Sequence, residues 1–204
     1  MRAIVIGSEL ISLSTAYHLS QIGYEVTLIE AQTKIDAAQS KNTLDVQLFR
    51  QELESKVRES GVNIRYACKA ERVMTQGNRV RGVVIKNENN ETETLMADRF
   101  VAGLDNKGNA LLKTIGVMSP AHLKPFNSEH SHNPLIGKSR YTNLFLNIGY
   151  SSVSPTVVSQ TAQMLANFIY NPSLDTEEQS VVQSIQAGLS ALVNVFSPLG
   201  RLFA

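Results

Sequence analysis

The sequence predicts an α/β protein in which a parallel β-sheet carries helices and an antiparallel β-meander is inserted between its strands. Three observations lead to this prediction. The first thirty residues read as strand, turn, helix and strand. The middle of the chain alternates short β-branched runs with polar turns, and a late buried strand is followed by a helix. The 204 residues suffice for one large domain or two small ones with a packed core.

Composition and charge exclude several kinds of partner. The chain has 19 Lys and Arg against 18 Asp and Glu, so a net charge of +1 gives no electrostatic reason to expect nucleic acid. A hydrophobic share of 43% with 18% charged residues is that of an ordinary globular protein rather than a disordered one. The single cysteine, Cys68, allows no internal disulfide and no cysteine-based metal cluster, and we expect it in the core.

The chain shows no membrane-spanning or secretory pattern. No uninterrupted apolar run approaches the roughly 18–20 residues that a spanning helix needs. The apolar run near the N-terminus stops at Gly7, without the length or the cleavage site of a signal peptide. We therefore expect a cytoplasmic protein.

The opening of the chain has the pattern of a βαβ unit. Residues 3–6 form a continuous apolar run that Gly7 closes, as in a strand buried on both faces. Residues 10–23 carry apolar side chains at helical spacing and end on a glycine. Residues 26–29 form a second buried strand, and Glu30 follows it directly. A unit of this size is typical of dinucleotide-binding proteins.

The chemistry of such a unit is specific, but its glycine pattern is incomplete here. The helix N-terminus faces a pyrophosphate, and an acidic residue placed like Glu30 accepts hydrogen bonds from the ribose hydroxyls. The fingerprint G-x-G-x-x-G falls on residues 7–12, where only Gly7 remains. Glu9 brings a bulky negative charge to the second position, and Ser12 is a milder change at the third. Two interpretations stay open: a dinucleotide site, and a unit that keeps its architecture but binds nothing.

The middle of the chain predicts one amphipathic helix and a set of strands. The helix runs from Asp45 to Gly61. Polar turns at residues 77–78 and 87–91 separate the next strands, which makes them an antiparallel meander. The stretches expected as strands are residues 62–66, 70–75 and 80–85 in this region, followed by a returning buried strand over 97–103.

The second half predicts a final strand and helix, and then a tail. Residues 107–115 read as a short helix, 119–132 as a loop or join, 144–149 as a strand with its turn, and 156–170 as a helix. Residues 179–204 contain one charge, Arg201, beside an apolar stripe. We expect this tail to pack on the core or to meet a second copy or another protein. Peripheral contact with the inner membrane is the alternative.

Several segments resemble one known family. They are Arg2-Ala-Ile-Val-Ile-Gly-Ser with Gly23-Tyr-Glu-Val-Thr-Leu-Ile-Glu, Leu44-Asp-Val-Gln-Leu-Phe, Ala97-Asp-Arg-Phe-Val, and Pro134-Leu-Ile-Gly with Tyr141-Thr-Asn-Leu-Phe-Leu-Asn-Ile-Gly. Together and in order, they resemble the D-amino-acid dehydrogenases, FAD-dependent flavoproteins of the D-amino-acid oxidase and glycine oxidase type. The resemblance covers most of residues 1–170.

The resemblance implies a Rossmann-like FAD-binding domain over residues 1–172, with residues 173–204 as a helical tail. It implies FAD as the cofactor and a D-amino acid as the substrate, which is oxidatively deaminated to a 2-oxo acid. It identifies no catalytic residue and no metal ligand. The positions that it assigns to FAD are Gly7, Ser8, Leu10, Ile11 and Glu30 for the ADP half, Ala70 beside them, and Gly149 and Tyr150 toward the flavin.

The chain also departs from the family pattern. Family members are longer, and most of their substrate domain has no counterpart here, with gaps expected at about residues 31–43 and 119–132. Several positions at which the family backbone approaches FAD carry other residues, namely Glu9, Ser12, Asp105, Ser151 and Ser154. The alternative to an FAD-dependent oxidoreductase is therefore an inactive flavin-fold remnant that serves as a binding or interaction module.

Overall fold

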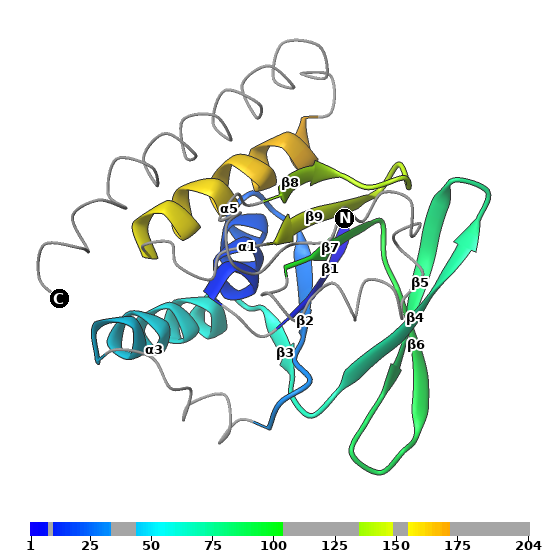
Figure 1. Ribbon diagram of the computed structural model, residues 1–204, viewed down its shortest axis with the longest axis horizontal. Helices are drawn as coiled ribbons and strands as arrows, with labels where there is room; N and C mark the ends of the chain where they lie inside the picture. Colours follow the sequence, from blue (N-terminus) through cyan, green and yellow to red (C-terminus); the bar gives the residue numbers. More distant parts are fainter. Residues whose placement is uncertain (8–9, 34–43, 104–134, 149–154, 172–204) are drawn as a thin grey trace, which may run out of the picture.

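The structure is a computed structural model that describes residues 1–7, 10–33, 44–103, 135–148 and 155–171 (Figure 1). Three layers make up this part of the chain: a layer of helices, a central sheet and a meander. Within these described ranges, no helix is long and apolar enough to cross a bilayer.

The central sheet has six strands in the order β3-β2-β1-β7-β9-β8. All neighbouring strands are parallel except β8, which runs antiparallel to β9 at the edge. The parallel part grows outward from β1 in both directions, as in doubly wound sheets. The strands are β1 Arg2–Ile6, β2 Glu25–Ile29, β3 Asn63–Arg65, β7 Arg99–Ala102, β8 Leu135–Lys138 and β9 Leu144–Ile148.

Three helices cover one face of this sheet (Figure 1). Helix α1 follows β1, α3 precedes β3, and α5 follows β9. Every second residue of the strands points toward them, and one core cluster joins Val5, Val101 and Phe145 to the inner faces of the helices. The helices are α1 Leu10–Gln21, α3 Leu44–Glu59 and α5 Pro155–Tyr170.

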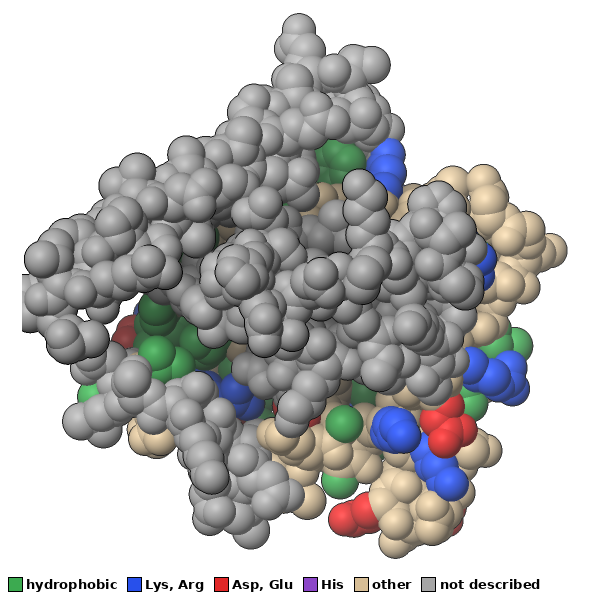
Figure 2. All heavy atoms as spheres, in the orientation of Figure 1, with side chains coloured by type: hydrophobic (Ala, Val, Ile, Leu, Met, Phe, Trp, Pro, Cys, Tyr) green, Lys and Arg blue, Asp and Glu red, His purple; other side chains and the backbone are tan. Residues whose placement is uncertain are grey.

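The antiparallel meander β4-β5-β6 covers the opposite face of the sheet (Figure 1). The alternate residues of the sheet strands, among them Ile4, Phe100 and Leu146, form a second core cluster with its strands, and Cys68 is buried there. On the face shown in Figure 2, Lys and Arg lie next to Asp and Glu over this region. The strands are β4 Lys69–Gln76, β5 Arg79–Lys86 and β6 Thr92–Met96.

A buried asparagine ties the meander to the sheet. Asn143 is 1% exposed and lies directly before β9. Its Oδ1 accepts a hydrogen bond from the amide of Val80 at 2.9 Å, and its Nδ2 donates to the carbonyls of Val80 at 2.8 Å and of Asp98 at 3.0 Å. One side chain therefore satisfies the amide and carbonyl of Val80, which a buried interface would otherwise leave unpaired, and adds a second donor to the Asp98 carbonyl.

The predicted elements are confirmed where the structure describes them. The βαβ unit, the helix over residues 45–61, the meander, the returning strand, the final strand and the last helix all form, with ends shifted by a few residues. β6 and β8 are additions, because residues 92–96 were predicted in no strand and residues 135–138 stood out in the sequence only as part of a motif. Four predictions fall outside the described residues: the helix at 107–115, the join at 119–132, the later part of the gap around 31–43, and the tail at 173–204.

Candidate functional site

The candidate site begins at Gly7, where β1 ends. Its φ is +138°, a conformation that side chains rarely adopt. A Cβ at this position would lie 1.9 Å from the carbonyl oxygen of Gly103, so the position has no room for one. The Gly7 amide donates to the carbonyl of Ile29 on β2, and the Gly103 amide donates to the carbonyl of Ile6. The carboxyl ends of β1, β2 and β7 therefore meet at this glycine.

Ser12 fits at the third fingerprint position because the neighbouring strand end also lacks a side chain. Its hydroxyl is fully buried and donates to the carbonyl oxygen of Gly103. A Cβ on Gly103 would lie 2.7 Å from that hydroxyl oxygen. Close packing of α1 on the sheet, which a glycine usually permits, is thus kept by a serine facing a glycine. In the sequence, Gly103 stands out only as the last residue of a predicted strand, although a glycine that directly follows a buried run is a usable signal.

Glu30 occupies the position expected for a ribose-binding carboxylate. It follows the last residue of β2 and is only 2% exposed. Its Oε1 accepts a hydrogen bond from the amide of Gln32 at 2.7 Å, and its backbone pairs with Arg65 and Cys68. The carboxylate is therefore held in place at the strand end next to Gly7. A fixed acceptor at this position suits the hydroxyls of an adenosine ribose.

The other described candidates are Leu10, Ile11 and Ala70. Leu10 and Ile11 begin α1, whose first amides lack intrahelical partners and point toward the strand ends. Their side chains face the other way, with Ile11 packed against Val158 and Ala162 of α5. Ala70 is 3% exposed and lies in the core under the meander, two residues after the amide that bonds Glu30.

The remaining candidates lie outside the described residues. They are Ser8, Gly149 and Tyr150, together with the departures Glu9, Asp105, Ser151 and Ser154. In the described ranges, no group of His, Cys, Asp and Glu side chains has the arrangement of a metal site.

A second buried asparagine holds α1 in position beside the site. Asn147 of β9 is fully buried, and its Nδ2 donates to the Thr15 hydroxyl at 3.3 Å. Thr15 in turn donates to the carbonyl of Ile11 in the first turn of α1, at 2.7 Å. The two asparagines of the Tyr141–Gly149 motif therefore have distinct structural roles. Asn143 fixes the meander, and Asn147 fixes the helix whose N-terminus borders the site.

Comparisons with known proteins agree with this geometry. Residues 2–91 match the model of the family described as "Pyridine nucleotide-disulphide oxidoreductase". Over 87 residues, which are 43% of this chain, the sequence is 31% identical to a D-amino acid dehydrogenase from Dechloromonas aromatica (strain RCB). The match spans 21% of that protein, so the chain corresponds to about a fifth of its curated relative.

Two solved structures share the fold over most of their length. L-proline dehydrogenase from P. horikoshii superposes with a TM-score of 0.60 at 9% identity, over 82% of this chain and 92% of that chain. THI4 from Thermovibrio ammonificans gives a TM-score of 0.57 at 15% identity, over 86% and 90% of the two chains. The predicted resemblance is thus confirmed for part of the chain, which over that part is similar to a D-amino acid dehydrogenase and has a Rossmann-like fold.

Proposed function

We propose that this chain is the FAD-binding part of an oxidoreductase that converts D-amino acids to 2-oxo acids. The observation that carries the proposal is the pairing of Gly7 and Glu30 at adjacent strand ends. A glycine without room for a side chain lies beside a buried, positioned carboxylate. This arrangement meets the two requirements of an ADP site, close approach of the backbone and an acceptor for the ribose.

The residues present fit the ADP half of FAD. The first amides of α1 would face the pyrophosphate, and Glu30 would accept hydrogen bonds from the ribose hydroxyls. Ser8, Leu10 and Ile11 would border the phosphates in the proposal, whereas Ala70 would line the adenosine side. Gly149 and Tyr150 are proposed to lie toward the flavin. When bound, FAD supplies the acceptor for the hydride that leaves the α-carbon of the amino acid.

A D-amino acid as the substrate rests on the relative alone. The similar protein is named a D-amino acid dehydrogenase, and the match covers a fifth of it. We propose the same substrate class here, and a protein partner or second copy as the target of the tail.

A scaffold that no longer binds FAD is the second candidate, and one observation favours it. The Ser12 hydroxyl already bonds the Gly103 carbonyl, so the junction of α1 and β7 is completed by the protein itself. A negative charge at Glu9 would also oppose a phosphate nearby.

Activity after reconstitution separates the two candidates. The chain is incubated with FAD, and D-amino-acid-dependent reduction of a dye is followed by absorbance. We expect reduction with D- but not L-amino acids, and Glu9→Gly should bind FAD more tightly because it removes the opposing charge. A chain that binds no FAD, or one whose dye reduction shows no preference for D-amino acids, would refute the dehydrogenase proposal. A Glu9→Gly variant with unchanged and already tight affinity would refute the scaffold.

A further inference from the structure

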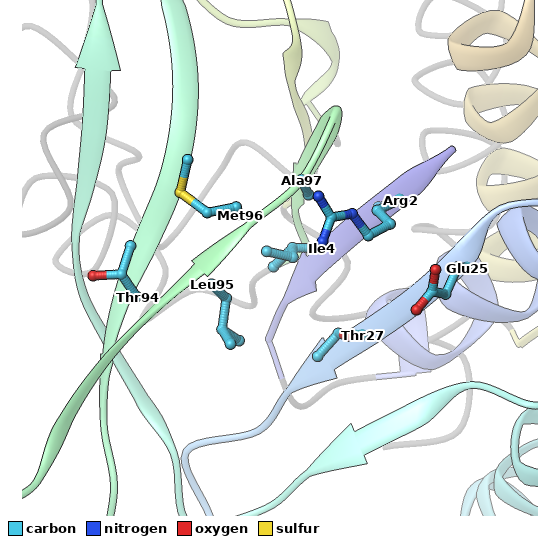
Figure 3. Close-up of a pocket in the computed structure, with 9 residues that line it drawn as sticks. Arg2, Ile4, Glu25, Thr27, Thr94, Leu95, Met96 and Ala97 are labelled. Carbon is cyan, nitrogen blue, oxygen red and sulfur yellow. The ribbon is translucent and has the colours of Figure 1, made fainter.

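A cavity of about 300 Å³ lies at the end of the sheet opposite to the candidate FAD site (Figure 3). Strands β1 and β2 form one wall, and β6 with Ala97 forms the other. Gly7 is five residues along β1 from Arg2, about 16 Å in an extended strand. The cavity is therefore separate from the strand ends that carry Gly7 and Glu30.

Two opposite charges border this cavity from neighbouring strands. Arg2 and Glu25 are register partners on β1 and β2, and both side chains point toward β6 (Figure 3). In the part of the chain that the structure describes, neither charged group forms an ion pair. Another pair that links the sheet to the meander does close, because Arg65 of β3 bonds Glu93 of β6 at 2.8 Å.

The rest of the lining divides into apolar and hydroxyl groups. Ile4 is buried behind the charges, and the side chain of Leu95 lines the cavity from β6, whereas that of Met96 points away from β1 and β2 (Figure 3). Thr27 adds a hydroxyl that donates or accepts hydrogen bonds, whereas the side chain of Thr94 points away from β1 and β2 (Figure 3). A volume of about 300 Å³ is at the lower end of ligand pockets, which is enough for a molecule the size of an amino acid.

We propose that this cavity binds a free α-amino acid as its zwitterion, with an apolar side chain of medium size. The guanidinium of Arg2 receives the ligand carboxylate, and the carboxylate of Glu25 receives its ammonium group. Neighbouring strands lie about 4.8 Å apart, so the backbones that carry Arg2 and Glu25 are separated by about this distance. The carboxylate and ammonium groups bonded to the α-carbon of one ligand can bridge the two side chains at such a separation. The ligand side chain packs on Ile4 and Leu95.

A ligand with one charge satisfies only half of this arrangement. An amine alone leaves Arg2 unpaired, and a carboxylic acid alone leaves Glu25 unpaired. The cavity therefore favours the zwitterion over ligands that carry only one of its two charges. Because the cavity is remote from Gly7, the site does not depend on FAD, and its test is independent of the proposed function.

Titration calorimetry of the purified chain without FAD tests the proposal. The ligands are L-leucine, D-leucine, isoamylamine, which lacks the carboxylate, and 4-methylpentanoate, which lacks the ammonium group. We expect saturable one-to-one binding of leucine with a Kd on the order of 1 mM, and at least about tenfold weaker binding of both fragments. The enantiomers are compared to define the stereochemical preference of the site.

Variants locate the binding. Arg2→Gln and Glu25→Gln should each weaken leucine binding by at least about tenfold, whereas Arg2→Lys should retain part of it because the charge remains. Arg81→Gln and Glu88→Gln, which are exposed and do not line the cavity, serve as matched controls. Circular dichroism confirms that each variant is folded.

Absence of saturable leucine binding by the folded chain would overturn the proposal. Equal affinity for isoamylamine and leucine, or unchanged affinity in both cavity variants, would overturn it as well. Glu30→Gln should leave leucine binding unchanged, so failure of this site and failure of the FAD site are distinguishable.

Discussion

Replacing Asn143 with alanine should destabilise the whole domain, because this side chain joins the meander to the sheet. The substitution removes three hydrogen bonds at a position that is 1% exposed. It leaves the amide and carbonyl of Val80 without their partner, whereas the carbonyl of Asp98 keeps a hydrogen bond from the Arg99 guanidinium at 3.2 Å. Each buried polar group that loses its partner costs about 1–3 kcal/mol, and partial relaxation or water entry recovers some of this. We expect a loss of about 2–5 kcal/mol in the free energy of unfolding.

Urea unfolding followed by circular dichroism measures this loss, since the chain has no tryptophan to report by fluorescence. An unchanged slope with a lower midpoint would show that stability, and not the denatured state, has changed. Asn167→Ala is the matched control, because Asn167 is an exposed asparagine of α5. It should shift the free energy of unfolding by no more than about 0.5 kcal/mol. An Asn143→Ala variant as stable as this control would refute the role assigned to Asn143.

Three further predictions concern a strand end and two titrating side chains. Gly7→Ala should prevent stable folding, because the added Cβ would lie 1.9 Å from a backbone oxygen. Gly77→Ala meets nothing within 4 Å and carries only the backbone strain of its φ of +59°, so it should fold with a loss of about 1–2 kcal/mol. Thermal unfolding of both variants decides this. Burial and a hydrogen bond to Glu54 raise the pKa of Tyr66 from 10.0 to about 12. The contribution of Tyr66 to the free energy of unfolding is therefore complete below pH 10 and is lost as the pH rises through 12. In urea unfolding at each pH, Tyr66→Phe should flatten that loss. Burial lowers the pKa of His18 from 6.5. The folded state therefore favours the neutral imidazole, and the free energy of unfolding falls as the pH drops below 6.5. A His18→Gln variant whose stability has the same acid dependence as that of the original chain would contradict this.

The sheet and its helices were predictable because their signals are local. A strand buried on both faces reads as a continuous apolar run, as residues 3–6 do, and these residues are buried in the structure. The turn at Gly23 and the helix before it follow from spacing alone, and Gly23 has a φ of +89°. Glu30 follows β2 directly, as the apolar run before it predicts, whereas its role toward a ribose stays a prediction.

The contacts that complete the site were not predictable from the sequence. Ser12 and Gly103 are 91 residues apart, and only the pairing of β1 with β7 brings them together. Asn143 looks like a polar interruption at the start of an apolar strand, and its partner Val80 lies 63 residues earlier. The cavity beside Arg2 likewise depends on how the meander folds back over the sheet, which no local pattern encodes.

Titration of the purified chain with FAD, followed by visible absorbance after gel filtration, tests the central claim most directly. Our account predicts a flavin band that travels with the protein and a weaker one for Glu30→Gln. The loss of one charged hydrogen-bond acceptor, about 1.5–3 kcal/mol, corresponds to at least about a tenfold lower affinity. Glu88→Gln, at an exposed hairpin tip, should retain the band. A chain that remains colourless, or a Glu30→Gln variant that keeps the full band, would contradict the placement of FAD beside Gly7 and Glu30.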